Sequence, residues 1–433
     1  MKHSKYIFAT IAIIMVIFLN SCSKDYGNLN NPTVEQFLSN ASRSELNNLV
    51  SGTESGLRNN LAIYLDDIGI IGREGYRFSG SEPRYTTDLL GANEATLNGS
   101  NFYITNPWTS RYRVIKNCNL LIEAANNSTL ISDIEKRGYI GFATTIKAYQ
   151  LLLNINLTDS NGIRINVSDP ENLGPIVSYD EGLSSVAVLL DSAKVVLKTA
   201  VVAFPLAGFE GFSDAPGLIQ VNRAIAARVA AYRKKWPEVL TDLNESFFGL
   251  TNDFYLGVYN VFGTGSGDQL NPMFIPRNQS GEVRVVHPSY ASSISTGDDR
   301  ILKAPLRTSI ASQEGLSSNR DVWVYTSNTA QIPIIRNEEL ILLYAEANIQ
   351  TNGTTEAVKA INIIRAGHNI APYAGSVTQG ALINQMLYQR WFSLFYEGHR
   401  WIDLRRYNQL GTLPVDRPSD NVWTEFPLPV SEQ

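Results

Sequence analysis

The sequence predicts a mainly α-helical protein, in which tetratricopeptide-like helix pairs pack against an irregular, loop-rich half with a few short strands. Two observations predict this fold class. Apolar residues recur at three- and four-residue spacing over long parts of the chain, as in amphipathic helices. Two segments, residues 69–106 and 254–329, lack that spacing and are rich in Gly, Ser and Asn with scattered aromatic residues.

The expected helices occur in both halves of the chain. Apolar spacing predicts them at residues 33–38, 45–61, 108–126, 138–157, 180–193, 221–236, 237–243, 338–349, 355–365 and 379–395. Thr33 can cap the first, and Gly353 and Gly367 can close the two helices that end near them. The large and small residues of these two helices alternate as in a tetratricopeptide-like pair. Short strands are expected at residues 283–286 and 322–325.

The start of the chain has the pattern of a secretory signal. A basic beginning is followed by an apolar run at residues 7–19 and then by Leu19-Asn20-Ser21-Cys22. The run is shorter than the roughly 20 residues that a membrane-spanning helix needs. The junction resembles the bacterial lipobox, which implies a signal peptide at residues 1–21 and a lipidated, for example palmitoylated, Cys22. The alternative is an ordinary cleaved signal with a cysteine beside its cleavage site.

Composition and spacing divide the rest of the chain. The polar, turn-rich residues 22–32 are expected to form a lipid-anchored tether. A helical N-terminal region at 33–253 and a C-terminal region at 254–433 follow. The latter is expected to contain a loop-rich part at 254–335 and helices at 336–407.

Charge and cysteine content exclude several classes of function. A net charge of −5 without a dense basic run argues against nucleic acid as a partner. Of two cysteines, Cys118 lies in an apolar-striped stretch and is expected to be a buried thiol, without a disulfide partner if Cys22 is acylated. No histidine pair and no calcium loop of alternating acids is present, so we expect no metal site and no cofactor.

The two loop-rich segments are the expected ligand-binding regions, because sugar rings present apolar faces for stacking and hydroxyls for hydrogen bonds. For each aromatic residue in them, core packing is the alternative. The candidates are Arg73, Tyr76, Arg77, Tyr85, Asp88 and Asn101 in the first region, and Tyr290, Arg300, Trp323 and Tyr325 in the second.

Three patterns that could be catalytic are interpreted as structural. Residues 397–401 combine Glu, His and Arg, but a glycine after an acid marks a tight turn, and the nearby arginines can tie helix ends together. Residues 263–267 resemble a phosphate-binding loop but lack its lysine, so a surface loop is expected. The neighbouring acids Asp66–Asp67 and Asp298–Asp299 point apart and are expected to cap helices or to lie in solvated loops, not to hydrolyse glycosides.

Three stretches resemble the SusD/RagB family of outer-membrane nutrient-binding lipoproteins: residues 333–347, 360–365 and 389–407. Weaker likeness extends upstream to Trp108, Tyr112, residues 119–121, 148–149 and 226–229. The Arg-Ala-Gly at residues 365–367 is shorter than the family's usual pattern.

The resemblance implies a helical body with four tetratricopeptide-like helix pairs. It further implies that this body forms a lid on a SusC-type TonB-dependent transporter and is lipid-anchored at the outer membrane of a Gram-negative bacterium, facing the cell exterior. Family members capture oligosaccharides, or peptides in the RagB branch, and are not enzymes.

The expected function is therefore capture of a nutrient, an oligosaccharide in the first place, and its delivery to the transporter without chemical change. Three alternatives stay open: a peptide-binding RagB-type lipoprotein, a lipid-anchored glycoside hydrolase, and a helical-repeat scaffold that has no ligand.

Overall fold

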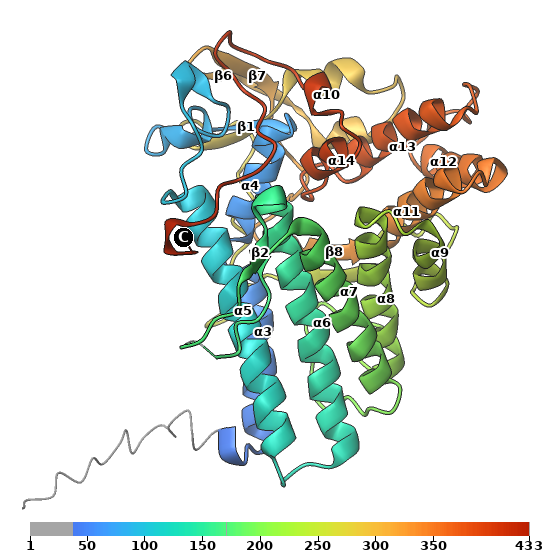
Figure 1. Ribbon diagram of the computed structural model, residues 1–433. Helices are drawn as coiled ribbons and strands as arrows, with labels where there is room; N and C mark the ends of the chain where they lie inside the picture. The colour runs from blue at the N-terminus through green and yellow to red at the C-terminus, as the bar shows by residue number, and fades with distance from the viewer. Residues whose placement is uncertain (1–37, 170, 433) are drawn as a thin grey trace, which may run out of the picture.

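The structure is a computed structural model that describes residues 38–169 and 171–432 (Figure 1). The expected signal peptide, Cys22, the tether and the Thr33 cap lie outside the described residues. In the described part of the chain, no helix is long and apolar enough to cross a membrane.

Helices form most of the body, which confirms the mainly α fold class. They are α3 (Arg43–Arg58), α4 (Leu61–Ile71), α5 (Phe102–Asn127), α6 (Asp133–Thr158), α7 (Tyr179–Leu197), α8 (Ala215–Tyr232), α9 (Trp236–Asn244), α10 (Pro288–Ser293), α11 (Asn337–Gln350), α12 (Thr354–Gly367), α13 (Gln379–Ser393) and α14 (Arg400–Arg406). The long helices α5 to α8 run side by side and form the lower part of the molecule in Figure 1.

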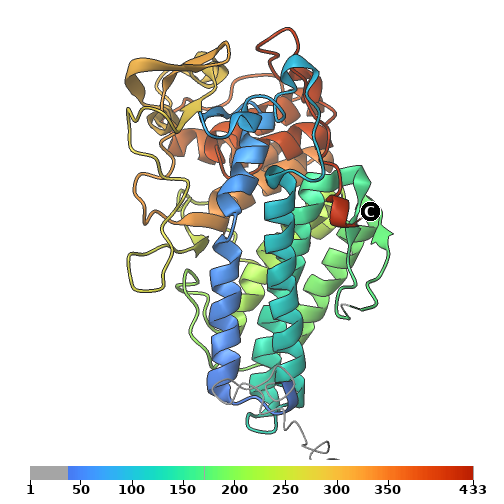
Figure 2. The ribbon, with the colours of Figure 1, turned by 90° about the vertical axis from the view of Figure 1, so that its left-hand side faces the viewer.

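The strands pair only in twos, all antiparallel. The pairs are β1 (Gly75–Phe78) with β5 (Val283–Val286), β2 (Ile163–Arg164) with β3 (Ile176–Val177), β4 (Gly257–Asn260) with β8 (Ile332–Arg336), and β6 (Leu306–Gln313) with β7 (Leu316–Arg320). Figure 2 shows the loop-rich half at one pole, above α3 and α4, and the far ends of the long helices at the other.

Local capping explains where several helices begin. Ser42 and Glu45 form a capping box at the start of α3, and Ser132 and Glu135 form another at the start of α6. Ser178 accepts a hydrogen bond from the Glu181 amide and caps α7. The capping box of α6 follows a five-residue turn after α5, so α5 and α6 form an antiparallel hairpin.

Two helix boundaries differ from the prediction. The expected helix at 45–61 ends at Arg58, because Asn60 takes a left-handed conformation (φ 53°) and the chain restarts as α4. The helix expected from residue 108 starts at Phe102 and contains Pro107. Proline is typical of the first turn of a helix, so Pro107 favours a start near residue 108. In the structure the helix extends five residues N-terminal to Pro107, and the predicted start is therefore too late.

The loop-rich half contains one predicted strand and lacks another. Residues 283–286 form β5, with all four residues buried. Residues 322–325 are not a strand; β7 ends at Arg320, and its partner β6 has mainly polar and exposed residues, which hid it from the sequence pattern. Residues 263–267 lie in a loop, as predicted.

α12 ends at Gly367, as predicted, but asparagines, not the predicted glycines, supply the left-handed residue beyond the ends of α11 and α12. Asn352 and Asn369 take left-handed conformations, with φ of 62° and 58°. The following amide then bonds back to a carbonyl five residues earlier, from Gly353 to Asn348 at 2.7 Å and from Ile370 to Arg365 at 2.8 Å. Asparagine tolerates this conformation, and so it fills the position usually taken by glycine.

The larger of two hydrophobic cores among the described residues extends from Ala41 to Phe426 and includes side chains of both halves, and the smaller one lies between α11, α12 and α13. Cys118 on α5 is fully buried in the larger core, and burial raises the pKa of its thiol to about 12. The prediction of a buried thiol is therefore confirmed.

The C-terminal strap, residues 413–432, crosses the molecule from the loop-rich half to the helices (Figure 1). Its backbone amides bond to elements far away in the sequence: Asn421 to the carbonyl of Leu90, Phe426 to that of Leu157, and Val430 to that of Gly99. The strap thus fixes the loops between α4 and α5 against α6.

Candidate ligand-binding site

The two predicted ligand-binding regions meet in the structure, because β1 from the first pairs with β5 from the second. Tyr76 and Arg77 lie on β1. The Tyr76 ring lies against the ring of His287, just beyond β5, with 5.1 Å between the ring centroids and a tilt of 56°. Sequence reasoning chose the regions separately and could not predict this pairing, which joins residues more than 200 positions apart.

Arg73 and Tyr76 are buried under the C-terminal strap. Arg73 is 0% exposed and donates to the carbonyls of Pro414 (3.0 Å) and Asn421 (2.7 Å). The Tyr76 hydroxyl bonds to the carboxylate of Asp416. Both side chains therefore hold the strap and are not accessible to a ligand in this structure.

Arg77 and Tyr85 form a stacked pair, with the guanidinium 4.5 Å from the ring centroid. Arg77 also pairs with Asp66 at 2.6 Å. The Tyr85 ring is buried, whereas the Arg77 side chain keeps partial access to solvent.

Asp88 and Asn101 form a half-buried polar cluster at the N-terminus of α5, called here the Asp88–Asn101 cluster. The Asn101 amide donates to Asp88 at 3.0 Å and its carbonyl oxygen accepts from Arg84 at 3.0 Å. The Arg84 guanidinium lies 4.9 Å from the centre of the half-exposed Phe102 ring. The Trp423 indole from the strap donates to the Asp88 backbone carbonyl at 2.9 Å.

This cluster combines a carboxylate, an amide and a guanidinium with an aromatic ring beside them. These groups can bond to hydroxyls while the ring face stacks on a sugar. Sequence reasoning missed Arg84 and Phe102, although both lie in or at the end of the same loop. The apolar spacing predicts a helix only from residue 108, so Phe102 falls in the predicted loop, whereas in the structure it is the first residue of α5.

In the second region, Tyr290, Arg300 and Tyr325 are core residues. The Tyr290 ring is fully buried and its hydroxyl donates to the Arg300 carbonyl at 2.8 Å. The Arg300 guanidinium is held by both oxygens of Asp298, at 2.9 and 2.7 Å. The Tyr325 hydroxyl donates to the Tyr396 carbonyl at 3.0 Å. For these residues the core-packing alternative describes the structure.

Trp323 differs from its neighbours because it is only half buried. Its ring lies 5.9 Å from that of Phe274, which is also half buried, at an angle of 51°. The two rings form a second aromatic surface on the loop-rich half. Of the ten candidates, Arg77, Asp88, Asn101 and Trp323 therefore keep access to solvent, and the other six are buried.

The segments that carry the family resemblance form buried ion pairs, not a ligand site. Glu339 on α11 pairs with Arg228 on α8 through two bonds of 2.6 Å. Burial alone would raise the pKa of Glu339, but the Arg228 charge outweighs it and lowers the pKa to about 2. Arg336 likewise pairs with Glu397 at 2.8 Å.

The turn at residues 397–401 has the structural role that was predicted. Gly398 takes a φ of 83°, which only glycine adopts without strain. Beyond it, Arg400 donates to the Gly72 carbonyl at 2.9 Å and Arg405 to the Asn156 carbonyl at 2.8 Å. His399 is buried, which lowers its pKa to about 3 and keeps the ring neutral.

The two pairs of neighbouring acids do not form a hydrolytic site. Asp298 caps the short helix that follows it, as predicted. Asp66 and Asp67 contradict the prediction, because both lie inside α4 and are fully buried. Arg284 and Arg77 hold Asp66, whereas burial raises the pKa of Asp67 well above its usual value. Neither carboxyl can reach a substrate.

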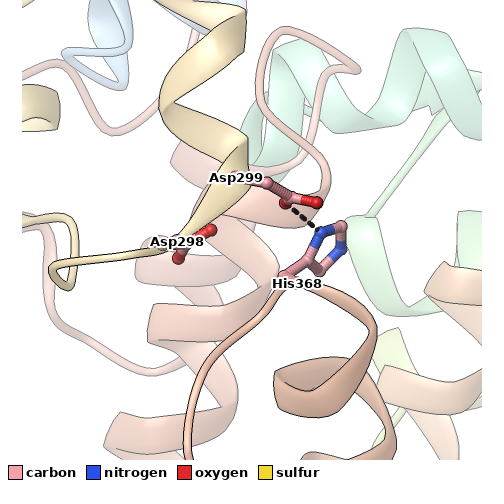
Figure 3. A group of neighbouring side chains, drawn as sticks. All are labelled: Asp298, Asp299 and His368. Carbon is pink, nitrogen blue, oxygen red and sulfur yellow. Dashed lines mark hydrogen bonds and ion pairs between the residues drawn. The ribbon is translucent and has the colours of Figure 1, made fainter.

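Asp298, Asp299 and His368 lie close enough to offer three ligand atoms to a metal (Figure 3). Each of these groups already has a partner in the chain. His368 bonds to Asp299 through Nδ1 and to Glu338 through Nε2, both at 2.7 Å, and Arg300 holds Asp298. The arrangement is therefore a network of hydrogen bonds that includes the Arg300–Asp298 ion pair, and a metal would have to displace one of these contacts.

Known proteins resemble the chain in sequence over its C-terminal part and in fold over most of its length. Residues 278–425 match the sequence model of the SusD family. No curated protein sequence matches the chain. Among solved structures, a SusD superfamily protein from Bacteroides vulgatus superposes with a TM-score of 0.68 at 16% identity, over 90% of this chain and 96% of the other.

Two further structures are similar. A SusD superfamily protein from Parabacteroides distasonis gives a TM-score of 0.67 at 15% identity, over 89% of this chain and 96% of the other. Surface glycan-binding protein A from Bacteroides thetaiotaomicron, solved in complex with laminarihexaose, gives 0.70 at 12% identity, over 90% and 97%. Residues 278–425 thus match the sequence model of the SusD family, and most of the chain has a fold similar to that of SusD superfamily proteins.

Proposed function

We propose that the protein binds an oligosaccharide on its loop-rich half and passes it to a SusC-type TonB-dependent transporter without chemical change. The observation that carries the proposal is the shared fold, over 90% of the chain, with a protein solved in complex with laminarihexaose. The Asp88–Asn101 cluster supports it with polar groups placed beside an accessible aromatic ring.

The proposed ligand contacts are the accessible residues of the two regions. Asp88, Asn101 and Arg77 would bond to hydroxyls, and the rings of Phe102 and Trp323 would stack on sugar faces. The buried candidates, such as Arg73, would hold these residues in place from within. An extended ligand could reach several of these points and gain affinity from each.

Anchoring and location belong to the same proposal. Lipidation of Cys22 would hold the protein at the outer membrane, facing the cell exterior, where it could act as a lid on the transporter. Acyl chains contribute about 0.8 kcal/mol for each buried CH₂, so several chains would anchor it stably.

Calorimetric titration with a glycan panel tests the proposal. At least one oligosaccharide should bind, and Phe102→Ala or Trp323→Ala should weaken binding by up to roughly tenfold, because an aromatic contact is worth about 0.5–1.5 kcal/mol. Trp236→Ala is the matched control, since Trp236 is also half buried but lies on α9.

Three outcomes would contradict the proposal. Release of shorter sugars during incubation would indicate a hydrolase, and binding only to peptides would favour a RagB-type ligand. Failure of every sugar and peptide to bind or to raise the melting temperature would favour a scaffold without a ligand.

A further inference from the structure

A cavity of about 240 Å³ lies on the helical side of the molecule, away from the Asp88–Asn101 cluster, between α3, the loop at residues 205–211 and β4. We call it the α3–β4 pocket. The residues that line it include Ser51, Glu54, Phe209, Tyr259 and Asn260. None of the ten predicted ligand residues lines it.

The sequence builds this pocket from residues on one face of α3 and from a close turn. Ser51, Glu54 and Arg58 follow one another at spacings of three and four residues and so share a helix face. Opposite them, Gly208 has a φ of 78° and accepts the Tyr259 amide at 2.9 Å. A Cβ at Gly208 would lie 2.1 Å from the Tyr259 carbonyl oxygen, so glycine lets the loop close on β4.

The pocket lining holds two carboxyl groups, Glu54 and Asp268, and one cationic side chain, Arg58. Glu54 accepts the Ala207 amide at 2.8 Å, and no Lys, Arg or His of the described residues forms a salt bridge with it. Arg58 is engaged by Asp268 at 2.7 Å and by the Val261 carbonyl at 2.6 Å. Burial, countered in part by Arg58 and reinforced by Glu210, raises the pKa of Glu54 to about 7.

The walls suit a cation that can donate hydrogen bonds. Phe209 and Tyr259 are among the residues that line the pocket. Asn260 also lines it; this residue is only 5% exposed, and its Oδ1 accepts no hydrogen bond from the described residues. An ammonium group offers three donors and no acceptor, whereas an anion would meet the Glu54 carboxylate.

We propose that the α3–β4 pocket binds a small ligand that carries a primary ammonium group, which pairs with Glu54. The volume is below the range of about 300–1,000 Å³ typical of drug-sized ligands, so the ligand would be the size of one sugar ring or one side chain. An amino sugar and a lysine side chain share this chemistry. The inference goes beyond the proposed function, because this site does not depend on oligosaccharide binding to the loop-rich half.

Titration of the purified protein with matched small ligands tests the inference. D-glucosamine should bind at pH 7 and D-glucose, which replaces the amine with a hydroxyl, should bind at least tenfold more weakly. Nα-acetyl-lysine amide distinguishes the two sources: tighter binding than glucosamine identifies a side-chain amine as the ligand, and weaker binding identifies an amino sugar.

Variants locate the site. Ser51→Trp should block the pocket and weaken glucosamine binding at least tenfold, whereas Ser44→Trp, at an exposed position two turns earlier on the same face of α3, should leave it unchanged. Glu54→Gln keeps an acceptor for the Ala207 amide, so the fold should persist while the preference for glucosamine over glucose is lost.

Equal affinity for glucosamine and glucose, no binding of either amine, or unchanged binding by Ser51→Trp would overturn the inference. Phe102→Ala and Trp323→Ala should not alter glucosamine affinity. If the protein binds an oligosaccharide but not glucosamine, the inference about the pocket is wrong and the proposed function is unaffected. If it binds glucosamine in the pocket but no oligosaccharide, the proposed function is wrong and the inference is unaffected.

Discussion

At the scale of single residues, buried ion pairs connect helices, some of them far apart in the sequence and some consecutive. Glu339 on α11 faces Arg228 on α8, and Arg390 on α13 holds Asp403 on α14 at 2.6 Å. A buried charge without its partner destabilises the fold, so the residue type at one position of each pair restricts the residue types allowed at the other. This mutual dependence accounts for the specificity of the sequence pattern at residues 333–347 and 389–407.

Removal of one partner should therefore be severe. Glu339→Ala leaves Arg228 buried and unpaired, and we expect it to lower the free energy of unfolding by about 3–5 kcal/mol at pH 7. Urea denaturation followed by circular dichroism measures the change. Glu238→Ala is the control: it breaks a surface pair with Arg233 of 3.0 Å and should cost less than about 1 kcal/mol. Similar losses in both variants would mean that the buried pair does not hold α8 to α11.

The sequence could identify candidate ligand residues only by type and by region. Arg73 and Tyr76 lie in a stretch without apolar periodicity, which is typical of an exposed loop. They are buried because the strap, more than 300 residues further along the chain, covers them. Such a contact leaves no local pattern. Asp88 and Asn101 stay accessible at the end of a helix, and their cluster remains a prediction until a ligand is measured.

At the scale of elements, the pairing of β1 with β5 joins the two predicted binding regions. Helices were predicted well because a three- to four-residue apolar period is a local signal. The sequence did not predict β1 or β6. β1 is short and pairs with a strand distant in sequence, and β6 is mainly polar. The pairing partner of a strand is set by the tertiary fold, and a single sequence does not show it.

A glycine makes the β1–β5 pairing possible. A Cβ at Gly75 would lie 2.5 Å from the Val285 carbonyl oxygen and 2.6 Å from the Tyr396 hydroxyl. Gly75→Ala should therefore lower the free energy of unfolding by about 1–3 kcal/mol, as overpacking of a core does. Gly80→Ala is the control, because a Cβ there meets nothing within 4 Å. A melting temperature unchanged by Gly75→Ala would show that β1 can move away from β5 without cost.

At the scale of the whole molecule, the larger core and the C-terminal strap unite the helical and loop-rich halves. The mainly helical fold class and the resemblance to the SusD family were both predicted from the sequence, the first from periodicity and the second from the pattern of residues 333–347 and 389–407. Anchoring at Cys22 is a prediction about residues outside the described part of the chain.

The Cys22→Ala variant tests whether anchoring and binding are separable. It should release the protein from membranes in a fractionation experiment, because no acyl chain would remain. The purified body should keep the glycan affinity of the unmodified protein, since the proposed ligand contacts lie on the loop-rich half. Loss of affinity in the purified variant would mean that the anchor contributes to the binding site.

The length of α5 has a mechanical consequence. The side chain of Asn127, at its C-terminal end, bonds to the carbonyl of Leu38 at 3.1 Å, while its N-terminal end carries the Asp88–Asn101 cluster. Its 26 residues therefore separate the start of the described chain from that cluster by about 40 Å. At this helix length, a rotation of the body by about 30° around Leu38 would move the cluster through roughly 20 Å. The same rotation would hardly move the residues next to Leu38.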